Sequence, residues 1–269
     1  RDPLWSRGLG DVYKRQGLHG LIIQFQIEPE EKETRPDVDY QTIFSHSQLD
    51  ELILSMLSAK AVAIDTETTS LNYIEAELVG ISVSIKPNEA FYIPLKHDYE
   101  GVPAQIDRNT VLEKLKPWLE NKDTIKVGNN LKYDSHIFSN YGLNLQGQVF
   151  DTMMLSYVNN SIATRHNLGA VAKSYLNINP SSYEDVAGKG AKQISFQQVG
   201  IEEATFYAAE DADISLQLHH VLTPDLKKQT ALYDLYTNVE EPLIAVLAAV
   251  ERNGVLVDST LLNLSLIHI

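Results

Sequence analysis

The sequence predicts an α/β fold in which a mixed five-stranded sheet is flanked by helices. Its 269 residues, 43% of them hydrophobic, are enough for one well-packed domain with appendages. The apolar, β-branched run at 61–64 is typical of a strand that is covered on both faces. Two further apolar runs are separated only by residues 86–88, which indicates a hairpin. After residue 124, strands and helices alternate, and this order favours parallel pairing.

The elements follow from residue type and period along the chain. A helix over 47–58, with leucines at helical spacing, precedes the sheet and is expected to pack on it. The core is then predicted to contain, in order, strands 61–67, 77–85 and 89–95, helix 109–120, strand 124–128, helix 131–141, strand 148–151 and helix 152–159. Helices near 166–176 and 197–220 complete it. A last helix runs from Tyr233 to Arg252 and is capped by Asn253-Gly254.

The two ends of the chain do not resemble the rest. Residues 1–16 have no apolar period and resemble translated sequencing adapter. Residues 265–269 resemble adapter as well, so we expect both segments to be non-native. An acidic stretch with two prolines makes 17–45 a predicted linker. This division leaves one domain at 46–230 and the start of another at 231–264.

Composition restricts the function. The net charge of −14 argues against a broad basic surface for duplex nucleic acid, although not against a site that meets a few nucleotides through metals and local cations. The sequence has no cysteine, which excludes disulfides and thiolate sites and is compatible with a reducing compartment. It has neither an apolar run of about 18 residues nor a convincing signal peptide, so we expect a cytoplasmic protein without membrane insertion.

Acidic residues end the first predicted strand. Because side chains alternate along a strand, Asp65 and Glu67 point to the same side. Two buried carboxylates so close repel each other, and a divalent cation such as Mg²⁺, which prefers hard oxygen ligands, relieves the repulsion. An isolated Asp-x-Glu is more often a polar strand end that runs into a turn.

A second motif follows strand 124–128. Asn129 and Asn130 are expected to cap the next helix, which puts Asp134 in its first turn, facing the strand ends. Taken alone, the motif is better explained by capping and by an acid that complements the helix dipole.

A third motif lies on the long helix near the end of the domain. Tyr207 and Asp211 are at i and i+4 and share one face, where a phenol one turn from a carboxylate can orient a water. Glu210 and Asp213 lie on other faces and are expected to be solvated or to support the site indirectly. By itself, Tyr207 is better explained as a partly buried aromatic on an amphipathic helix.

Together these motifs resemble the DEDD exonuclease superfamily in its tyrosine subclass, and more closely the 3′→5′ proofreading domain of bacterial DNA polymerase I (family A). Phe206 stands where the histidine subclass would have His, which favours the tyrosine subclass. The matching segments run in unbroken order from about residue 60 to about residue 260: Val62 to Thr68, Val127 to Asp134, Phe150 to Met153, Ala187 to Gly190, Tyr207 to Asp213 and Val250 to Val255. The resemblance implies a ribonuclease H-like fold.

The resemblance also implies a two-metal hydrolysis that releases nucleoside 5′-monophosphates from DNA 3′ ends. Asp65 would bridge two Mg²⁺ or Mn²⁺ ions, and Glu67 and Asp211 would complete the tighter site. Asp134 would bind the second ion, mainly through water, while Tyr207 and Glu67 would orient the attacking water. In such a site one metal lowers the pKa of the water, and the pair stabilises the attacking and leaving oxygens.

Contacts with a single-stranded DNA 3′ end are implied in the same way. Leu71 matches a position that wedges against the terminal base, and Asn130 matches one that contacts the terminal nucleotide. Arg165 and Tyr183 match positions near the single-stranded substrate. The chain departs from many relatives at Asn129, where they have Gln, and the shorter amide is expected to change a backbone contact.

In the family, the segment that corresponds to 231–264 begins the polymerase domain, and the synthesis motifs have no counterpart in this sequence. We therefore expect a monomeric fragment of a longer protein, without synthesis of its own, whose partner is the polymerase domain of the full-length chain. Three alternatives stay open. An RNA-directed exonuclease of the same subclass would prefer RNA oligomers, a catalytically silent scaffold would bind DNA without turnover, and a purely structural domain would not respond to metals.

Overall fold

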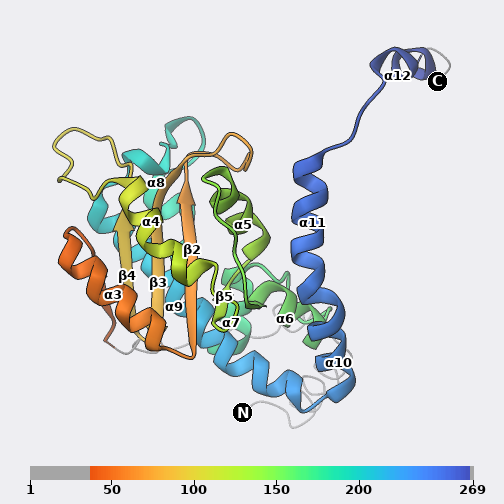
Figure 1. Cartoon of the computed structure of the whole chain (residues 1–269), viewed down its shortest axis with the longest axis horizontal. Coiled ribbons are helices and arrows are strands. Elements are labelled where there is room, and N and C mark those ends of the chain that lie inside the picture. The colour runs from red at the N-terminus through yellow and green to blue at the C-terminus, as the bar shows by residue number, and fades with distance from the viewer. Residues whose placement is uncertain (1–36, 267–269) are drawn as a thin grey trace, which may run out of the picture.

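The computed structural model describes residues 37–266, and its centre is a mixed sheet whose strand order is β1-β4-β3-β2-β5-β6 (Figure 1). The strands are β1 (Asp39–Thr42), β2 (Ala61–Thr68), β3 (Leu78–Lys86), β4 (Glu89–Pro94), β5 (Ile125–Gly128) and β6 (Gln148–Asp151). The predicted hairpin is confirmed, since β3 and β4 are antiparallel and Asn88 turns between them with a φ of 65°. The predicted parallel pairing of β5 with β2 and β6 is confirmed as well.

The sheet has six strands, one more than predicted. The additional strand, β1, lies within the segment predicted to be a linker and pairs in parallel with β4. Its four residues are mostly polar, so no apolar alternation marks them. Contacts with a distant helix hold the strand instead: Tyr40 donates a hydrogen bond of 2.8 Å to Asp213, and the Thr42 and Thr205 hydroxyls lie 2.7 Å apart. Residues 1–16, predicted to be non-native, lie outside the described residues, as do 267–269.

The predicted helices are present, most with ends within a few residues of those expected. The helices are α3 (His46–Ser58), α4 (Arg108–Leu119), α5 (Leu131–Asn140), α6 (Thr152–Asn159), α7 (Leu168–Leu176), α8 (Tyr183–Ala187), α9 (Ile201–Lys227), α10 (Thr230–Leu235), α11 (Glu241–Asn253) and α12 (Ser259–Leu266). The sequence did not predict α8 or α12. The single helix predicted over 233–252 is interrupted by a π turn at Tyr236–Glu240, just before Pro242, which has no backbone N–H to continue the α-helical pattern.

Helices cover both faces of the sheet, with α3 and α4 on one face and α9 across the other (Figure 1). On the α9 face, the middle of β3 presents the small residues Gly80, Ser82 and Ser84, which pair with Glu67, Asp65 and Ala63 of β2. Small side chains let the helix approach the sheet closely. This approach brings Asp211, in the N-terminal half of α9, to the strand that bears Asp65.

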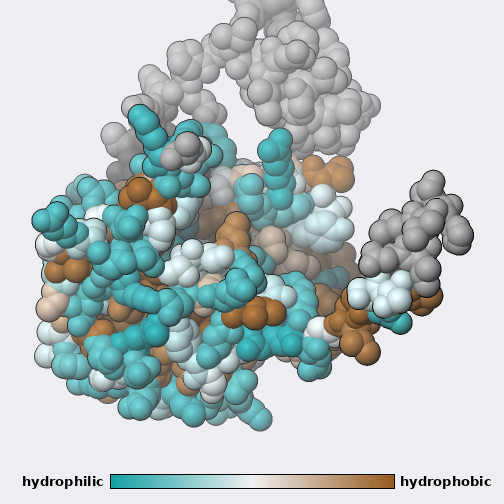
Figure 2. Space-filling model, turned by 90° about the horizontal axis from the view of Figure 1, so that it is seen from above, coloured by the Kyte–Doolittle hydropathy of each residue, from teal (hydrophilic) through white to brown (hydrophobic). Residues whose placement is uncertain are grey.

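The segment after α9 contacts the domain and then leaves it. The backbone N–H groups of Val149 and Asp151 in the edge strand β6 donate to the side chains of Glu241 (3.1 Å) and Tyr236 (3.0 Å). Beyond α11 the chain projects away and carries hydrophobic surface (Figure 2), including Leu256, which is fully exposed. Among the described helices, none is both long and apolar enough to span a membrane.

Candidate metal centre

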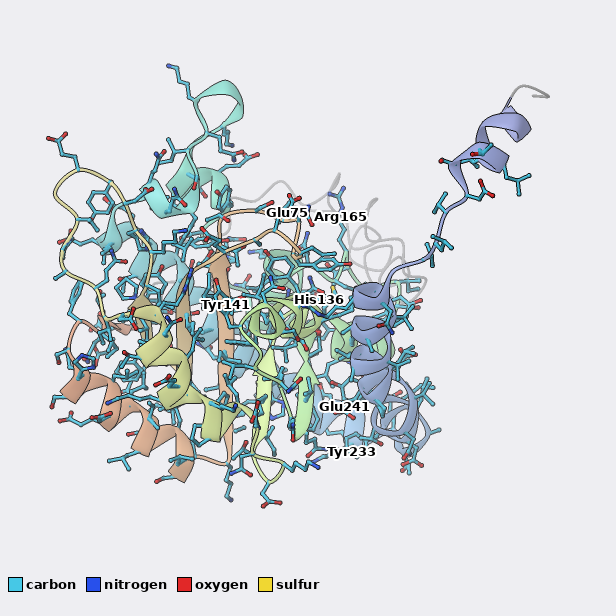
Figure 3. All side chains as sticks on the ribbon, turned by 45° about the horizontal axis from the view of Figure 1, so that its top comes forward. Glu75, His136, Tyr141, Arg165, Tyr233 and Glu241 are labelled. Atoms are coloured by element: carbon cyan, nitrogen blue, oxygen red, sulfur yellow. The ribbon has the colours of Figure 1, made fainter. Side chains whose placement is uncertain are left out.

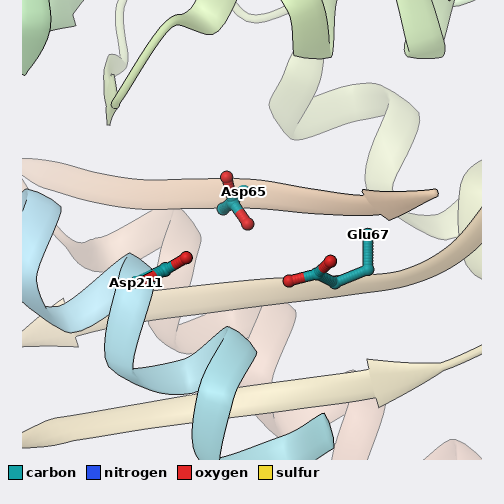
Figure 4. Close-up of side chains that lie close together, drawn as sticks. All are labelled: Asp65, Glu67 and Asp211. Atoms are coloured by element: carbon teal, nitrogen blue, oxygen red, sulfur yellow. The ribbon is translucent and has the colours of Figure 1, made fainter. Parts of the chain in front are cut away.

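Three carboxyl groups converge where β2 meets α9. One oxygen from each of Asp65, Glu67 and Asp211 lies within 4.8 Å of the others. Figure 4 shows the three carboxyl groups turned toward a common space. The i, i+2 spacing on β2 places Asp65 and Glu67 on the same face, and α9 supplies Asp211 from across that face.

The electrostatics of these three acids suit a cation. Burial, opposed by a backbone hydrogen bond from Thr66, raises the pKa of Asp65 to about 6. Burial and the charge of Asp65 raise the pKa of Glu67 and of Asp211 well above the usual range. Within residues 37–266, none of the three forms an ion pair with Lys, Arg or His. Clustered oxygen ligands with uncompensated charge match the donor set that Mg²⁺ or Mn²⁺ takes in proteins.

Asp134 lies beside this cluster but is not one of the three converging acids. It is 2% exposed in the first turn of α5, as predicted, and accepts a hydrogen bond of 2.6 Å from the Thr66 hydroxyl. Its pKa is raised by burial and then by the charge of Asp65. Asp134 is therefore electrostatically coupled to the cluster through Asp65.

The predicted asparagine cap of α5 is wrong. Asn130 is the N-cap residue but has a left-handed φ of 63° and makes no side-chain capping bond. Asp151 instead accepts the N–H groups that have no partner within the helix, from Asn130 at 3.1 Å and Leu131 at 2.8 Å. Asn129 accepts a hydrogen bond from Thr152 at 3.1 Å. The sequence signal for Asp151 was an Asp just before a helix, but its reach to α5 depends on the pairing of β5 with β6.

Tyr207 lies next to the three acids. Its hydroxyl hydrogen-bonds to the Asp211 carboxylate, and burial followed by the charges of Asp211 and Glu67 raises its pKa far above neutral pH. The tyrosine is therefore a hydrogen-bond donor under ordinary conditions. Its ring packs against Phe196 and Tyr183, with centroids 5.9 and 6.5 Å away.

The four residues expected near a nucleic-acid end come from different segments of the chain. Leu71 is 92% exposed in the loop after β2, and Asn130 lies at the start of α5. Tyr183 begins α8, is partly exposed and contacts Tyr207. Arg165 is exposed on the loop before α7 (Figure 3). Tyr183 alone among them has a ring contact with a residue of the site in the described part of the chain.

Glu210 and Asp213 are not solvated, so the first of the two expectations for these acids is wrong. Both are almost fully buried, because β1 and the loop after α7 cover these sides of α9. Glu210 accepts a hydrogen bond of 2.6 Å from the backbone of Ser181. Asp213 accepts bonds of 2.8 Å from both Tyr40 and the backbone of Asn88. These acids hold the fold around α9.

Comparisons with known proteins agree on one family. A family model described as 3′-5′ exonuclease matches residues 40–227. The chain is 45% identical over 230 residues to DNA polymerase I of Pseudomonas aeruginosa. This match covers 85% of this chain and 25% of that protein. It is 38% identical over 241 residues to DNA polymerase I of Rhizobium leguminosarum, with 83% and 24% covered. The chain thus spans about a quarter of the length of these curated relatives.

Solved structures share the fold at lower identity. The POL domain of Pol1 from M. smegmatis superposes with a TM-score of 0.63 at 17% identity, over 81% of this chain and 33% of that one. NrnC of Brucella melitensis gives a TM-score of 0.59 at 16% identity, over 81% and 94% of the two chains. RNase D of Trypanosoma brucei gives 0.55 at 14% identity, over 75% and 74%.

Proposed function

Since the chain belongs to the 3′-5′ exonuclease family of DNA polymerase A, we propose that it removes nucleoside 5′-monophosphates from DNA 3′ ends in a metal-dependent reaction. The observation that carries the proposal is the convergence of Asp65, Glu67 and Asp211 without a compensating cation.

We propose that the site holds two divalent ions, Mg²⁺ or Mn²⁺. Asp65, Glu67 and Asp211 would hold one ion, and Asp65 with Asp134 would hold the other. When bound, such ions lower the pKa of a water and offset charge on the oxygens of the phosphodiester. The carboxylates themselves fix the positions at which this happens, because β2 and α9 hold them rigidly.

Tyr207 would position the attacking water. Its raised pKa keeps the hydroxyl protonated at neutral pH, so the hydroxyl can donate to one oxygen and accept from a water. Glu67, on the adjacent strand, would accept the second hydrogen bond of that water. In this arrangement Tyr207 aligns the nucleophile and takes no proton from it.

Four residues would guide the DNA end. Leu71 exposes an apolar side chain that suits stacking against a terminal base, and Tyr183 offers a ring beside Tyr207. Arg165 supplies an exposed cation for a phosphate, and Asn130 an amide beside Asp134.

The chain spans about a quarter of its polymerase relatives, and we propose that residues 231–264 lead toward a polymerase region that delivers the 3′ end. We also propose that the chain acts as a monomer on a single strand.

The test is digestion of a 5′-labelled single-stranded DNA oligomer by the purified chain with Mg²⁺, with EDTA, and with the Asp65→Ala variant. We expect a ladder that shortens from the 3′ end with Mg²⁺ only. Intact DNA in the presence of a folded, metal-binding chain would contradict the proposal and favour a silent scaffold. An RNA oligomer of the same sequence tests the remaining alternative, and faster digestion of RNA would favour it.

A further inference from the structure

Ser82 of β3 has a buried hydroxyl with no partner. The residue is fully buried, and its Oγ forms no hydrogen bond with any group of residues 37–266. Leaving a buried hydroxyl unpaired costs free energy, so such a group in a well-packed core calls for an explanation.

The position of Ser82 points to the three converging acids. Ser82 pairs directly with Asp65 across the antiparallel β2–β3 ladder, so both side chains lie on the face that α9 covers. Directly paired residues have Cβ atoms about 4.5–5.5 Å apart. At that separation, a serine hydroxyl and an aspartate carboxyl oxygen can meet at about 2.7 Å after a change of serine rotamer.

Tyr92, which carries the other hydroxyl near Ser82, already donates its proton elsewhere. Tyr92 of β4 pairs with Ser82 and reaches over Gly80, where any Cβ would lie only 2.1 Å from its Oη. Nδ1 of His97 lies 3.0 Å from the carbonyl oxygen of Val199, which can only accept, so Nδ1 carries the proton. Nε2 must then accept, and the Tyr92 hydroxyl donates to it at 2.8 Å. Tyr92 therefore has no proton to offer to Asp65.

We propose that Ser82 is a positioning residue, whose hydroxyl donates a hydrogen bond to the Asp65 carboxylate when that carboxylate holds a divalent metal ion. Asp65 has two oxygens, and a donor on one of them leaves the other directed toward Glu67 and Asp211. The hydroxyl thus selects the rotamer of Asp65 that binds metal. The inference rests on the proposed function, because it requires that Asp65 be a metal ligand.

Ser84 provides a matched control. It lies two residues further along the same strand and on the same face, and is also fully buried. Its hydroxyl is already paired, with the carbonyl oxygens of Glu89 at 2.8 Å and Lys86 at 3.2 Å. Removing either hydroxyl makes the same small cavity, but only Ser82 faces Asp65.

The experiment measures Mn²⁺ binding to the whole chain by calorimetry, together with the melting temperature in EDTA. For Ser82→Ala we expect about tenfold weaker Mn²⁺ binding, as for loss of a hydrogen bond to a charged group. Its metal-free melting temperature should be unchanged or higher, since an unpaired buried hydroxyl is removed. For Ser84→Ala we expect a lower melting temperature and unchanged Mn²⁺ affinity. Wild-type affinity in Ser82→Ala would overturn the inference.

Two further variants separate the hydroxyl from packing. Ser82→Thr keeps the donor, and we expect it to bind Mn²⁺ within about threefold of wild type, a difference below 1 kcal/mol, even if the added methyl lowers its melting temperature. An equal loss in Ser82→Thr and Ser82→Ala would assign the effect to packing and overturn the inference. Should Ser82→Ala not fold, Ser82→Cys takes its place, because it keeps the volume and has only a weak donor.

The result also separates this inference from the proposed function. If wild type binds no Mn²⁺, or Asp65→Ala binds it equally well, the metal site itself is wrong. If wild type binds Mn²⁺ through Asp65 and Ser82→Ala matches it, only the role of Ser82 is wrong.

Discussion

Asp151 and Asp65 are both aspartates on strands of one sheet, and burial raises the pKa of both. Their hydrogen bonds differ. Asp151 accepts from four backbone N–H groups, those of Asn130, Leu131, Met153 and Met154, at 2.8–3.4 Å. Asp65 has one backbone hydrogen bond, from Thr66, and faces two other acids.

The comparison separates acids that build the fold from acids that are available to a ligand. Asp213 belongs with Asp151, since Tyr40, Asn88 and Gln217 all donate to it. Burial and a raised pKa do not distinguish Asp151 from Asp65, because desolvation acts on both carboxyl groups. The supply of hydrogen-bond donors does distinguish them.

The largest effect should come from Asp65, an acid with a single backbone donor. Asp65→Ala is expected to lower exonuclease turnover roughly 10²–10³-fold or more, the range seen when a group that stabilises charge at a reacting centre is removed. Its melting temperature in EDTA should be at least that of wild type, because a repelling charge is lost. A variant that keeps more than a few per cent of wild-type turnover in the oligomer assay would refute the role of Asp65.

Asp151→Ala should have the opposite profile. Loss of this carboxylate leaves several buried N–H groups at the starts of α5 and α6 without acceptors, so we expect a loss of about 3 kcal/mol in the free energy of unfolding. Urea denaturation measures it. Asp151→Asn, which keeps one acceptor oxygen, is the control and should lose less; equal stability of Asp151→Ala and wild type would remove the basis of the comparison.

Metal binding should stabilise the folded chain only through the acids that have few hydrogen-bond donors, Asp65, Glu67 and Asp211. Mg²⁺ or Mn²⁺ at about 100 times its dissociation constant is expected to add about 2.7 kcal/mol to the free energy of unfolding, by mass action. Thermal melts with metal and with EDTA provide the measurement. The increase should disappear in Asp65→Ala and persist in Asp213→Asn, if that variant folds; persistence in both would place the metal elsewhere.

Tyr207→Phe should have a smaller effect on the reaction. Only the hydroxyl that aligns a water is removed, so we expect turnover to fall about tenfold or somewhat more while metal binding is kept. Parallel rate and calorimetric measurements separate the two. Loss of metal binding in this variant would mean that Tyr207 holds Asp211 in place and does not act on water.

The smallest effect is on the pH dependence of metal-free stability. The pKa of Asp65 in the folded chain is about 6, above its ordinary value of 3.8, so the folded state binds this proton more tightly. Stability should therefore fall as the pH rises from about 4 through 6, and the raised pKa values of Glu67 and Asp211 should extend the fall upward. In EDTA the melting temperature should be a few degrees higher at pH 5 than at pH 7, and this difference should be smaller in Asp65→Asn.

Much of the framework could be predicted from local signals. The apolar run of β2, the short connection between β3 and β4, and the boundaries of α6 all follow from residues near one another in sequence. The same holds for the candidate site. The i, i+2 spacing puts Asp65 and Glu67 on one face of a strand, and the i, i+4 spacing puts Tyr207 and Asp211 on one face of a helix.

What could not be predicted depends on pairing across long sequence distances. The polar strand β1 is ordered by β4 and α9, and Asp151 reaches α5 only because β6 lies beside β5. Glu210 looked solvated because nothing in its own helix reveals the loop that covers it. Ser82 carries no signal in sequence at all, since its interest lies in its register with Asp65 and in its lack of a partner.

The side chains of Tyr236 and Glu241 along β6 have a consequence for self-association. An edge strand with free N–H and C=O groups is a template on which a second chain can add a strand. Here the N–H groups of Val149 and Asp151 are taken by those two side chains. A shortened chain that ends at residue 230 would keep every proposed metal ligand and yet uncover this edge. We expect such a chain to aggregate through edge-to-edge strand pairing at concentrations where the longer chain does not.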